Sequence, residues 1–312
     1  MKKLDLIFDT DVGSDCDDMM ALAYLIYAKR NLNVSIKAIT HCNGCVDGIP
    51  TIRAMFRHLG EECAPVGSVA VPSEAYDDYA KQVAERFADT SDRQEAPNAV
   101  SVLRRALCNS EEAVICAVGP FTNIAALLTS KGDEISKLDG VELVRKKCKR
   151  IVIMGGRFDV REPEWNARAD APATKTMVAL CPVPIVFVPF EAGYNMITGG
   201  PLMDTYGQST PLTMSFFLHS GVIEKGGQHS WDPITAVYAI EGCLDFFEES
   251  DACTVTVEDD GTTVVSGKGG MHTIISIKNH SGLTEQQCKD RIASYLDSCA
   301  VKVYLESFEN KK

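Results

Sequence analysis

Residues 4–18 read LDLIFDTDVGSDCDD, an apolar run followed at once by a dense acidic stretch. The run Leu4–Phe8 predicts a buried β-strand. Gly13 permits a tight turn behind this strand, and a helix predicted over Asp18–Lys29 presents its N-terminus to the last acids of the stretch. This strand–loop–helix unit indicates an α/β fold in which the acidic loop lies at the carboxyl end of the first strand.

The loop contains five aspartates within residues 9–18: Asp9, Asp11, Asp15, Asp17 and Asp18. Because clustered carboxylates repel one another at a buried strand end, a hard divalent cation with oxygen ligands is their natural partner. Helix capping is the alternative, but it accounts for one or two acids rather than five. An EF-hand does not fit, because Gly13 and Met20 stand where it needs an Asp or Asn and a Glu. The loop therefore predicts a metal site of another type.

Apolar runs alternate with amphipathic stretches up to about residue 200. The further predicted strands are Val34–Thr40, Ala113–Val118, Ile151–Met154 and Ile185–Pro189. The predicted helices between them are Ile49–Leu59, Pro120–Leu128 with Pro120 in its first turn, and Ala171–Leu180. Such alternation requires crossover connections, so the predicted fold is a largely parallel central sheet with helices on both faces. Ligands bind such sheets beyond the carboxyl ends of the strands.

The second half of the chain is less regular. Thr254–Val257 and Thr263–Val265 predict a β-hairpin, and Thr284–Phe308 predicts a long closing helix. No repeat, low-complexity tract or Pro/Ser-rich linker interrupts the chain. We therefore expect a single α/β domain over residues 1–312, with a small antiparallel addition near the C-terminus.

Composition narrows the class of protein. The 312 residues carry a formal charge of −12 without a Lys/Arg stripe, which argues against a nucleic-acid partner. An apolar share of 45% argues against disorder. No run approaches the roughly 18 apolar residues of a membrane span, and the charged start is unlike a signal peptide. The twelve cysteines mostly lie in apolar segments and form no zinc pattern. We expect a cytoplasmic protein with no membrane partner.

The acidic loop resembles the hallmark of the nucleoside hydrolase (inosine–uridine-preferring) family, Asp-x-Asp-x-Gly-x-Asp-Asp opening a helix, with two extra residues. Other segments resemble the family in the same order along the chain. They are Ala38-Ile-Thr40 with Asn43-Gly44, Gly119-Pro-Phe-Thr-Asn-Ile-Ala125, Met154-Gly-Gly156 with Glu164-Trp-Asn166 and Asp170, and Trp231-Asp232-Pro233. The resemblance spans about residues 4–240, and it implies a nucleoside hydrolase-like fold.

The resemblance implies Ca²⁺-dependent hydrolysis of the N-glycosidic bond of ribonucleosides, which yields ribose and free base in nucleoside salvage. It makes Asp11 the general base and also a calcium ligand. The further ligands it implies are the carboxylates of Asp18 and Asp232 and the main-chain oxygen of Val118, and Asp15, in the two-residue insertion, is another candidate. The substrate contacts it implies are Asp17, Glu164, Asn166, Asn43, Trp231 and His229, with Asp9 behind the metal ligands. Family members are commonly dimers or tetramers, so the partners expected are a nucleoside and further copies of the chain.

Two positions depart from the family pattern. Trp231 stands where better-known members have a His that protonates the leaving base, and an indole cannot do this. Cys45 replaces a loop asparagine, although Asn43 lies close by. Three explanations stay open for the leaving group. His219, His229 or, less directly, His272 reaches the base; Trp231 or Trp165 stacks on a purine; or the protein binds a nucleoside without hydrolysing it.

Other interpretations of these residues also stay open. Asp232 before Pro233 is suited to capping a helix over Ile234–Ile240, Asp170 to capping the helix after it, and Asn123 to satisfying local backbone groups. A Mg²⁺-dependent phosphatase of the haloacid-dehalogenase type would use Asp9 as nucleophile and Asp11 as acid, but Gly13 breaks its motif. A non-catalytic nucleoside or ribose sensor with the same metal site is the other rival.

Overall fold

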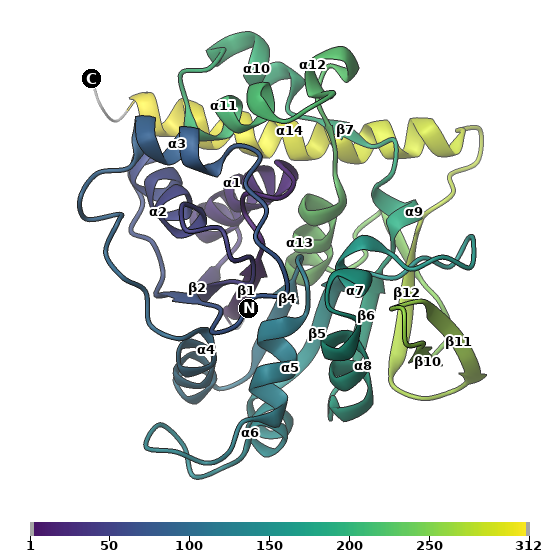
Figure 1. Cartoon of the computed structure of the whole chain (residues 1–312). Coiled ribbons are helices and arrows are strands. Elements are labelled where there is room, and N and C mark those ends of the chain that lie inside the picture. The colour runs from purple at the N-terminus through teal and green to yellow at the C-terminus, as the bar shows by residue number, and fades with distance from the viewer. Residues whose placement is uncertain (1–2, 310–312) are drawn as a thin grey trace.

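A ten-stranded sheet runs through the computed structural model, which describes residues 3–309 (Figure 1). The predicted domain 1–312 includes residues 1–2 and 310–312, which lie outside the described residues. The strand order is β11-β10-β12-β6-β5-β4-β1-β2-β3, with β9 on β12. The strands are β1 (Leu4–Thr10), β2 (Val34–His41), β3 (Val66–Ser68), β4 (Ala113–Ala117), β5 (Cys148–Met154), β6 (Ile185–Val188), β9 (Phe247–Glu249), β10 (Cys253–Val257), β11 (Thr263–Lys268) and β12 (His272–Ile277).

The strands from β3 to β12 run parallel, whereas β9, β10 and β11 are antiparallel to their neighbours. This arrangement confirms the predicted largely parallel sheet and its small antiparallel addition, which contains the predicted hairpin. A separate two-stranded sheet pairs β7 (Ile197–Thr198) with β8 (Gln228–His229).

Helices cover both faces of the sheet (Figure 1). Because side chains alternate along a strand, Leu6 and Phe8 pack into one core and Ile7 into the other. The helices are α1 (Asp17–Asn31), α2 (Gly48–His58), α3 (Ala80–Phe87), α4 (Ala99–Cys108), α5 (Thr122–Thr129), α6 (Gly140–Lys147), α7 (Trp165–Ala169), α8 (Ala171–Leu180), α9 (Phe190–Gly193), α10 (Gly200–Tyr206), α11 (Pro211–Leu218), α12 (Val222–Lys225), α13 (Trp231–Glu241) and α14 (Glu285–Glu309). Buried residues of α1, α13 and α14 belong to the first core, and those of α4, α5 and α8 to the second.

One local prediction was wrong, and one alternative that the sequence left open is excluded. Pro120 does not lie in the first turn of α5, because that helix begins at Thr122 with Phe121 as its N-cap. Asp232 does not cap its helix, because α13 begins at Trp231 with Ser230 as N-cap and Asp232 inside the first turn. In both places the helix boundary depends on backbone geometry that the proline alone does not determine.

The carboxyl ends of β1, β4 and β5 meet at one edge of the sheet. Asp11 follows β1, Val118 follows β4, and Met154 ends β5, so the topology gathers these residues although they are far apart in sequence. Within residues 3–309, no helix combines the length and the apolar character needed to cross a bilayer.

Candidate functional site

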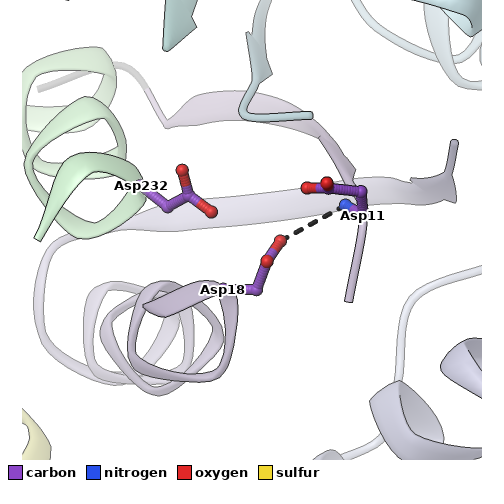
Figure 2. A group of neighbouring side chains, drawn as sticks. All are labelled: Asp11, Asp18 and Asp232. Atoms are coloured by element: carbon purple, nitrogen blue, oxygen red, sulfur yellow. Dashed lines mark hydrogen bonds between the residues drawn. The ribbon is translucent and has the colours of Figure 1, made fainter. Parts of the chain in front are cut away.

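Three buried carboxylates converge at this edge of the sheet. Asp11 comes from the loop after β1, Asp18 from the first turn of α1 and Asp232 from the first turn of α13. One oxygen from each lies within 4.8 Å of the others, and Figure 2 shows the three side chains pointing toward one another. Hard divalent cations prefer this set of oxygen donors.

One carboxylate oxygen of Asp18 accepts two hydrogen bonds, and the other accepts none from the described residues. Its Oδ1 accepts hydrogen bonds from the Thr10 hydroxyl and from the Asp11 backbone N–H, at 3.3 Å for the latter (Figure 2). Its Oδ2 is buried and has no hydrogen-bond partner among residues 3–309. An unpartnered buried carboxylate oxygen is costly unless something positive faces it, so the donor set fits a metal ion.

Asp17 connects helices α1 and α13, which bear Asp18 and Asp232. Its Oδ2 accepts hydrogen bonds from the backbone N–H groups of Trp231 at 2.9 Å and Asp232 at 3.0 Å. Asp17 therefore caps α13, where its charge also complements the positive helix end. The contact fixes the start of α13 against the start of α1, and so fixes Asp232 relative to Asp18.

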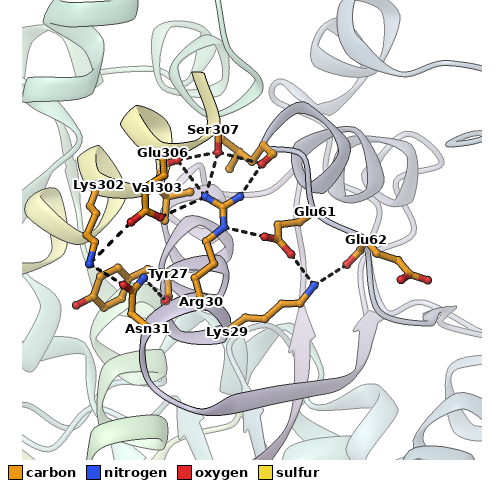
Figure 3. Close-up of polar contacts among 11 residues, drawn as sticks. Tyr27, Lys29, Arg30, Asn31, Glu61, Glu62, Lys302, Val303, Glu306 and Ser307 are labelled. Carbon is orange, nitrogen blue, oxygen red and sulfur yellow. Dashed lines mark hydrogen bonds and ion pairs between the residues drawn. The ribbon is translucent and has the colours of Figure 1, made fainter. Parts of the chain in front are cut away.

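The far end of α1 is anchored by Arg30 (Figure 3). Its guanidinium donates to Glu61 Oε1 at 2.7 Å, to the Val303 carbonyl oxygen at 3.2 Å and to Ser307 Oγ at 3.1 Å. These bonds connect α1 with α14 and with the chain after α2. The helix that presents Asp17 and Asp18 is therefore held at both ends.

Asp9 lies near the carboxyl end of β1 and is not one of the residues that line the cavity described below. It is fully buried, and its Oδ1 accepts hydrogen bonds from the Thr40 hydroxyl and from Asn123 Nδ2 at 2.8 Å. The expectation that Asn123 satisfies local backbone groups is therefore corrected, because its amide reaches across to β1. Asp170 does cap α8, since its side chain accepts from the Ala173 N–H.

A cavity of about 190 Å³ opens beside the three carboxylates. Most of the predicted site residues line it: Asp11, Asp15, Asp17, Asp18, Val118, Glu164, Asn166, Trp231 and Asp232. Glu164 caps α7 by accepting from the N–H groups of Asn166 and Ala167. The Asn166 amide donates to the Val118 carbonyl oxygen at 2.8 Å, which leaves that oxygen a second lone pair.

Two predicted residues, Asn43 and His229, do not line the cavity, and a third, Asp15, lies outside the carboxylate cluster. Asn43 does not line the cavity, because its amide holds the backbone of Asp11 and Tyr76 together. His229 lies behind Trp231, and its Nδ1 accepts from the Asn195 N–H. Asp15 lines the cavity but is not among the three clustered carboxylates; its Oδ1 accepts from the Cys16 N–H at 2.6 Å and from Gln228 Nε2 at 2.7 Å.

Aromatic side chains form the remaining walls. Trp231 stacks on Phe190 with ring centroids 5.4 Å apart, and its Nε1 donates to the Phe190 carbonyl oxygen at 2.9 Å. Trp165 also lines the cavity, and its ring centroid lies 5.5 Å from that of Tyr76. Phe190, Ser14 and Met154 also line the cavity but were not predicted as site residues; Ser14 and Met154 lie in segments that resemble the family, whereas no sequence signal marks Phe190.

Burial and mutual repulsion raise the pKa values of the clustered carboxyl groups. Burial raises the pKa of Asp11, Asp18 and Asp232 well above the usual range of aspartate, and neighbouring carboxylates raise these values further. Burial also raises the pKa of Asp9 and of Glu164 to about 7. A bound cation would reverse this preference by stabilising the ionised forms.

We expect the metal-free protein to lose thermal stability between pH 5 and pH 7.5. The raised pKa values of Asp9 and Glu164, about 7 against 3.8 and 4.5, mean that the folded state binds these protons more tightly than the unfolded state. This contribution to stability is present at pH below about 4 and is lost as the pH rises through 7. Thermal denaturation in chelator should show a falling Tm, with a shallower slope for Asp9→Asn; a rising Tm, or the same slope in the variant, would contradict the assignment.

Gly119 packs directly against Asp11. A Cβ at this position would lie 2.7 Å from Asp11 Oδ1 and 2.6 Å from Cys42 Sγ. We expect Gly119→Ala to displace the Asp11 carboxylate and to weaken divalent-cation binding by about 10–100-fold, the range for residues that support a metal ligand. Gly267→Ala is the matched control, because there the added Cβ meets nothing closer than 3.9 Å. Equal cation affinity of the two variants in calorimetry would argue against this packing.

Comparisons with known proteins place this geometry in context. The model of the family described as inosine-uridine preferring nucleoside hydrolase matches residues 6–301. Similar solved structures include an inosine-uridine preferring nucleoside hydrolase from Bacillus anthracis, 18% identical with a TM-score of 0.69, covering 95% of this chain and 99% of that one. A plant nucleoside hydrolase is 20% identical with a TM-score of 0.72, at 96% and 99% coverage.

An inosine-guanosine nucleoside hydrolase is likewise 18% identical with a TM-score of 0.68, at 94% and 99% coverage. At these identities the structural likeness shows a shared fold. None of the curated proteins is similar enough in sequence to count as a match.

Proposed function

The chain belongs to the inosine-uridine preferring nucleoside hydrolase family and is an enzyme that hydrolyses the N-glycosidic bond of ribonucleosides, and we propose that it does so with Ca²⁺ held by Asp11, Asp18 and Asp232. The observation that carries the proposal is the convergence of these three buried carboxylates beside the cavity. Family membership also sets aside the phosphatase alternative.

The donor set supports calcium as the ion. Three carboxylates and the free lone pair of the Val118 carbonyl are all hard oxygen donors, and no soft ligand stands among them. When bound, Ca²⁺ supplies a positive charge that orients the ribose diol and a water molecule near the anomeric carbon. Asp15 is left out of this ligand set, because its carboxylate is held by Gln228 away from the cluster.

The side chains of the protein act as general base, bind the sugar and stabilise the charge that develops on it. Asp11 removes a proton from the attacking water as general base. Asp17, Glu164 and Asn166 line the cavity where the sugar hydroxyls would bind, and their polarity suits that contact. The ring of carboxylates stabilises the oxocarbenium-like sugar that forms as the base departs with the bonding electrons.

The size of the cavity suggests where the base lies. At about 190 Å³ it is smaller than the roughly 300–1,000 Å³ of sites that enclose a whole ligand. We therefore place the sugar inside the cavity and the base at its mouth, between Trp165 and Trp231. A flat purine would gain more stacking there than a pyrimidine.

A ribose-release assay over the common purine and pyrimidine nucleosides tests the proposal. We expect turnover with Ca²⁺, faster on purine nucleosides, and none after chelation. Nucleoside binding without release of ribose from any substrate would favour the non-catalytic sensor instead.

Two further properties stay proposals. All twelve cysteines are free thiols, which supports a reducing compartment such as the cytoplasm and a role in nucleoside salvage there. The dimer or tetramer implied by the family resemblance is tested by light scattering of the purified chain.

A further inference from the structure

Trp231, His229 and His272 are not placed to give a proton to the leaving base. The Trp231 indole has a single N–H, and it is already donated to the Phe190 carbonyl oxygen. The Nδ1 atoms of His229 and His272 accept from the N–H groups of Asn195 and Val255, and neither ring lines the cavity. A base that leaves as an anion leaves slowly, so some other group must supply its proton.

Three carboxylates line the cavity outside the proposed metal cluster; Asp17 and Glu164 are engaged in capping α13 and α7, whereas Asp15 caps neither helix. Its side chain is one-third exposed, and it lines the cavity together with Trp231 and Trp165. Oδ1 is held by the Cys16 N–H and by Gln228 Nε2, while no described contact engages Oδ2. The held oxygen fixes the group, and the other oxygen is left for a ligand.

The imidazole of His219 lies next to the carboxylate of Asp15. Its Nε2 is 3.6 Å from Asp15 Oδ1, and its Nδ1 is 3.1 Å from Asp78 Oδ2, so the ring lies between two carboxylates. The side chain is only 14% exposed, and its Nδ1 makes no hydrogen bond within the described residues. His219 therefore stands between Asp15, which lines the cavity, and the more exposed Asp78.

We infer that Asp15 donates the proton to the departing base and that His219, which lies between Asp15 and Asp78, replenishes the proton of Asp15. The inference rests on the proposed function. It names a proton donor for a site in which Trp231 stands where better-known family members have a histidine. Asp15 is the catalytic residue, since it faces the cavity, and His219 is a positioning residue that acts through it. The 3.6 Å separation is longer than a hydrogen bond, as catalytic contacts without substrate often are.

The protons balance in this scheme. The C1′–N bond breaks with its electron pair on the base nitrogen, which takes a proton from Asp15 as Asp15 takes one from His219 Nε2. The water oxygen bonds to C1′, and its proton goes to Asp11. Asp11 then loses a proton to solvent, and His219 regains one from solvent. The sum is nucleoside plus water giving ribose plus neutral base.

The test compares two substrates with different leaving groups. Inosine needs a proton on its base, whereas p-nitrophenyl riboside releases a stable nitrophenolate without one. We expect His219→Gln and Asp15→Asn each to raise the ratio of nitrophenyl riboside to inosine turnover about 100-fold, the low end for loss of a general acid. An asparagine at position 15 can still accept from Cys16 and Gln228, so the loop is kept.

His280→Gln is the matched control, because that imidazole lies against Asp245 rather than at the cavity, and its ratio should not change. An equal fall on both substrates, or no change on either, would overturn the relay while wild-type turnover still upholds the hydrolase. A wild type that cleaves neither substrate would overturn the proposed function itself, and the relay with it.

Discussion

Asp11→Asn is expected to lower kcat for ribose release by about 10²–10⁴-fold, the contribution of a positioned general base. Asparagine matches aspartate in shape but cannot accept the proton of the attacking water. It also weakens one metal ligand, so the assay needs saturating Ca²⁺, with occupancy checked by calorimetry. Asp11 is buried at the end of β1 beside Gly119, which leaves little room for a neighbouring group to replace it.

Asp5→Asn is the matched control for this variant. Asp5 lies at the opposite end of the same strand, where it pairs with Lys37 at 3.6 Å outside the cavity. We expect its kcat to stay within about twofold of wild type, since surface ion pairs contribute little. If the calcium-loaded Asp11→Asn protein kept more than a tenth of wild-type kcat, Asp11 would not be the general base.

Removal of Ca²⁺ is expected to abolish turnover and to lower the thermal stability of the protein. An ion that binds only the folded state adds about 2.7 kcal/mol of stability at 100 times its Kd. The gain should be larger at pH 7.5 than at pH 5, because the ion and protons compete for Asp11, Asp18 and Asp232, whose pKa values burial raises.

Asp18→Asn and Asp232→Asn should each weaken Ca²⁺ binding by more than the roughly 10–100-fold expected for a supporting residue. Asp259→Asn serves as control, since that side chain is 94% exposed on the hairpin between β10 and β11. The measurements are calorimetric titration and thermal denaturation with and without Ca²⁺. Activity that survives exhaustive chelation would show that the hydrolysis needs no metal.

The sequence predicted the central strands well because their apolar runs are short and are followed by turn residues. Leu4–Phe8 and Ile185–Pro189 became β1 and β6 with shifts of at most two residues at their ends. Asp11, Asp18 and Asp232, the proposed metal ligands, could be picked out from the sequence because each belongs to a motif with fixed spacing. Local signals were sufficient for these features.

The contacts that hold the site were not predictable from local signals. Asp17 caps α13 across 215 positions, and Asn123 reaches Asp9 across 114. Neither pair shares a motif, and each forms only because the sheet brings its strands' carboxyl ends together. The approach of His219 to Asp15 is of the same kind, since it depends on where α11 ends relative to the acidic loop.

The most direct test of the account is calorimetric titration of Ca²⁺ into chelator-treated protein at pH 7.5, for the wild type and for a variant with Asp11, Asp18 and Asp232 all changed to Asn. We predict one bound ion per chain in the wild type and none in the variant, with both proteins folded by circular dichroism. Equal Ca²⁺ binding by the two proteins, or no binding by the folded wild type, would contradict the proposal that these three carboxylates form the metal site.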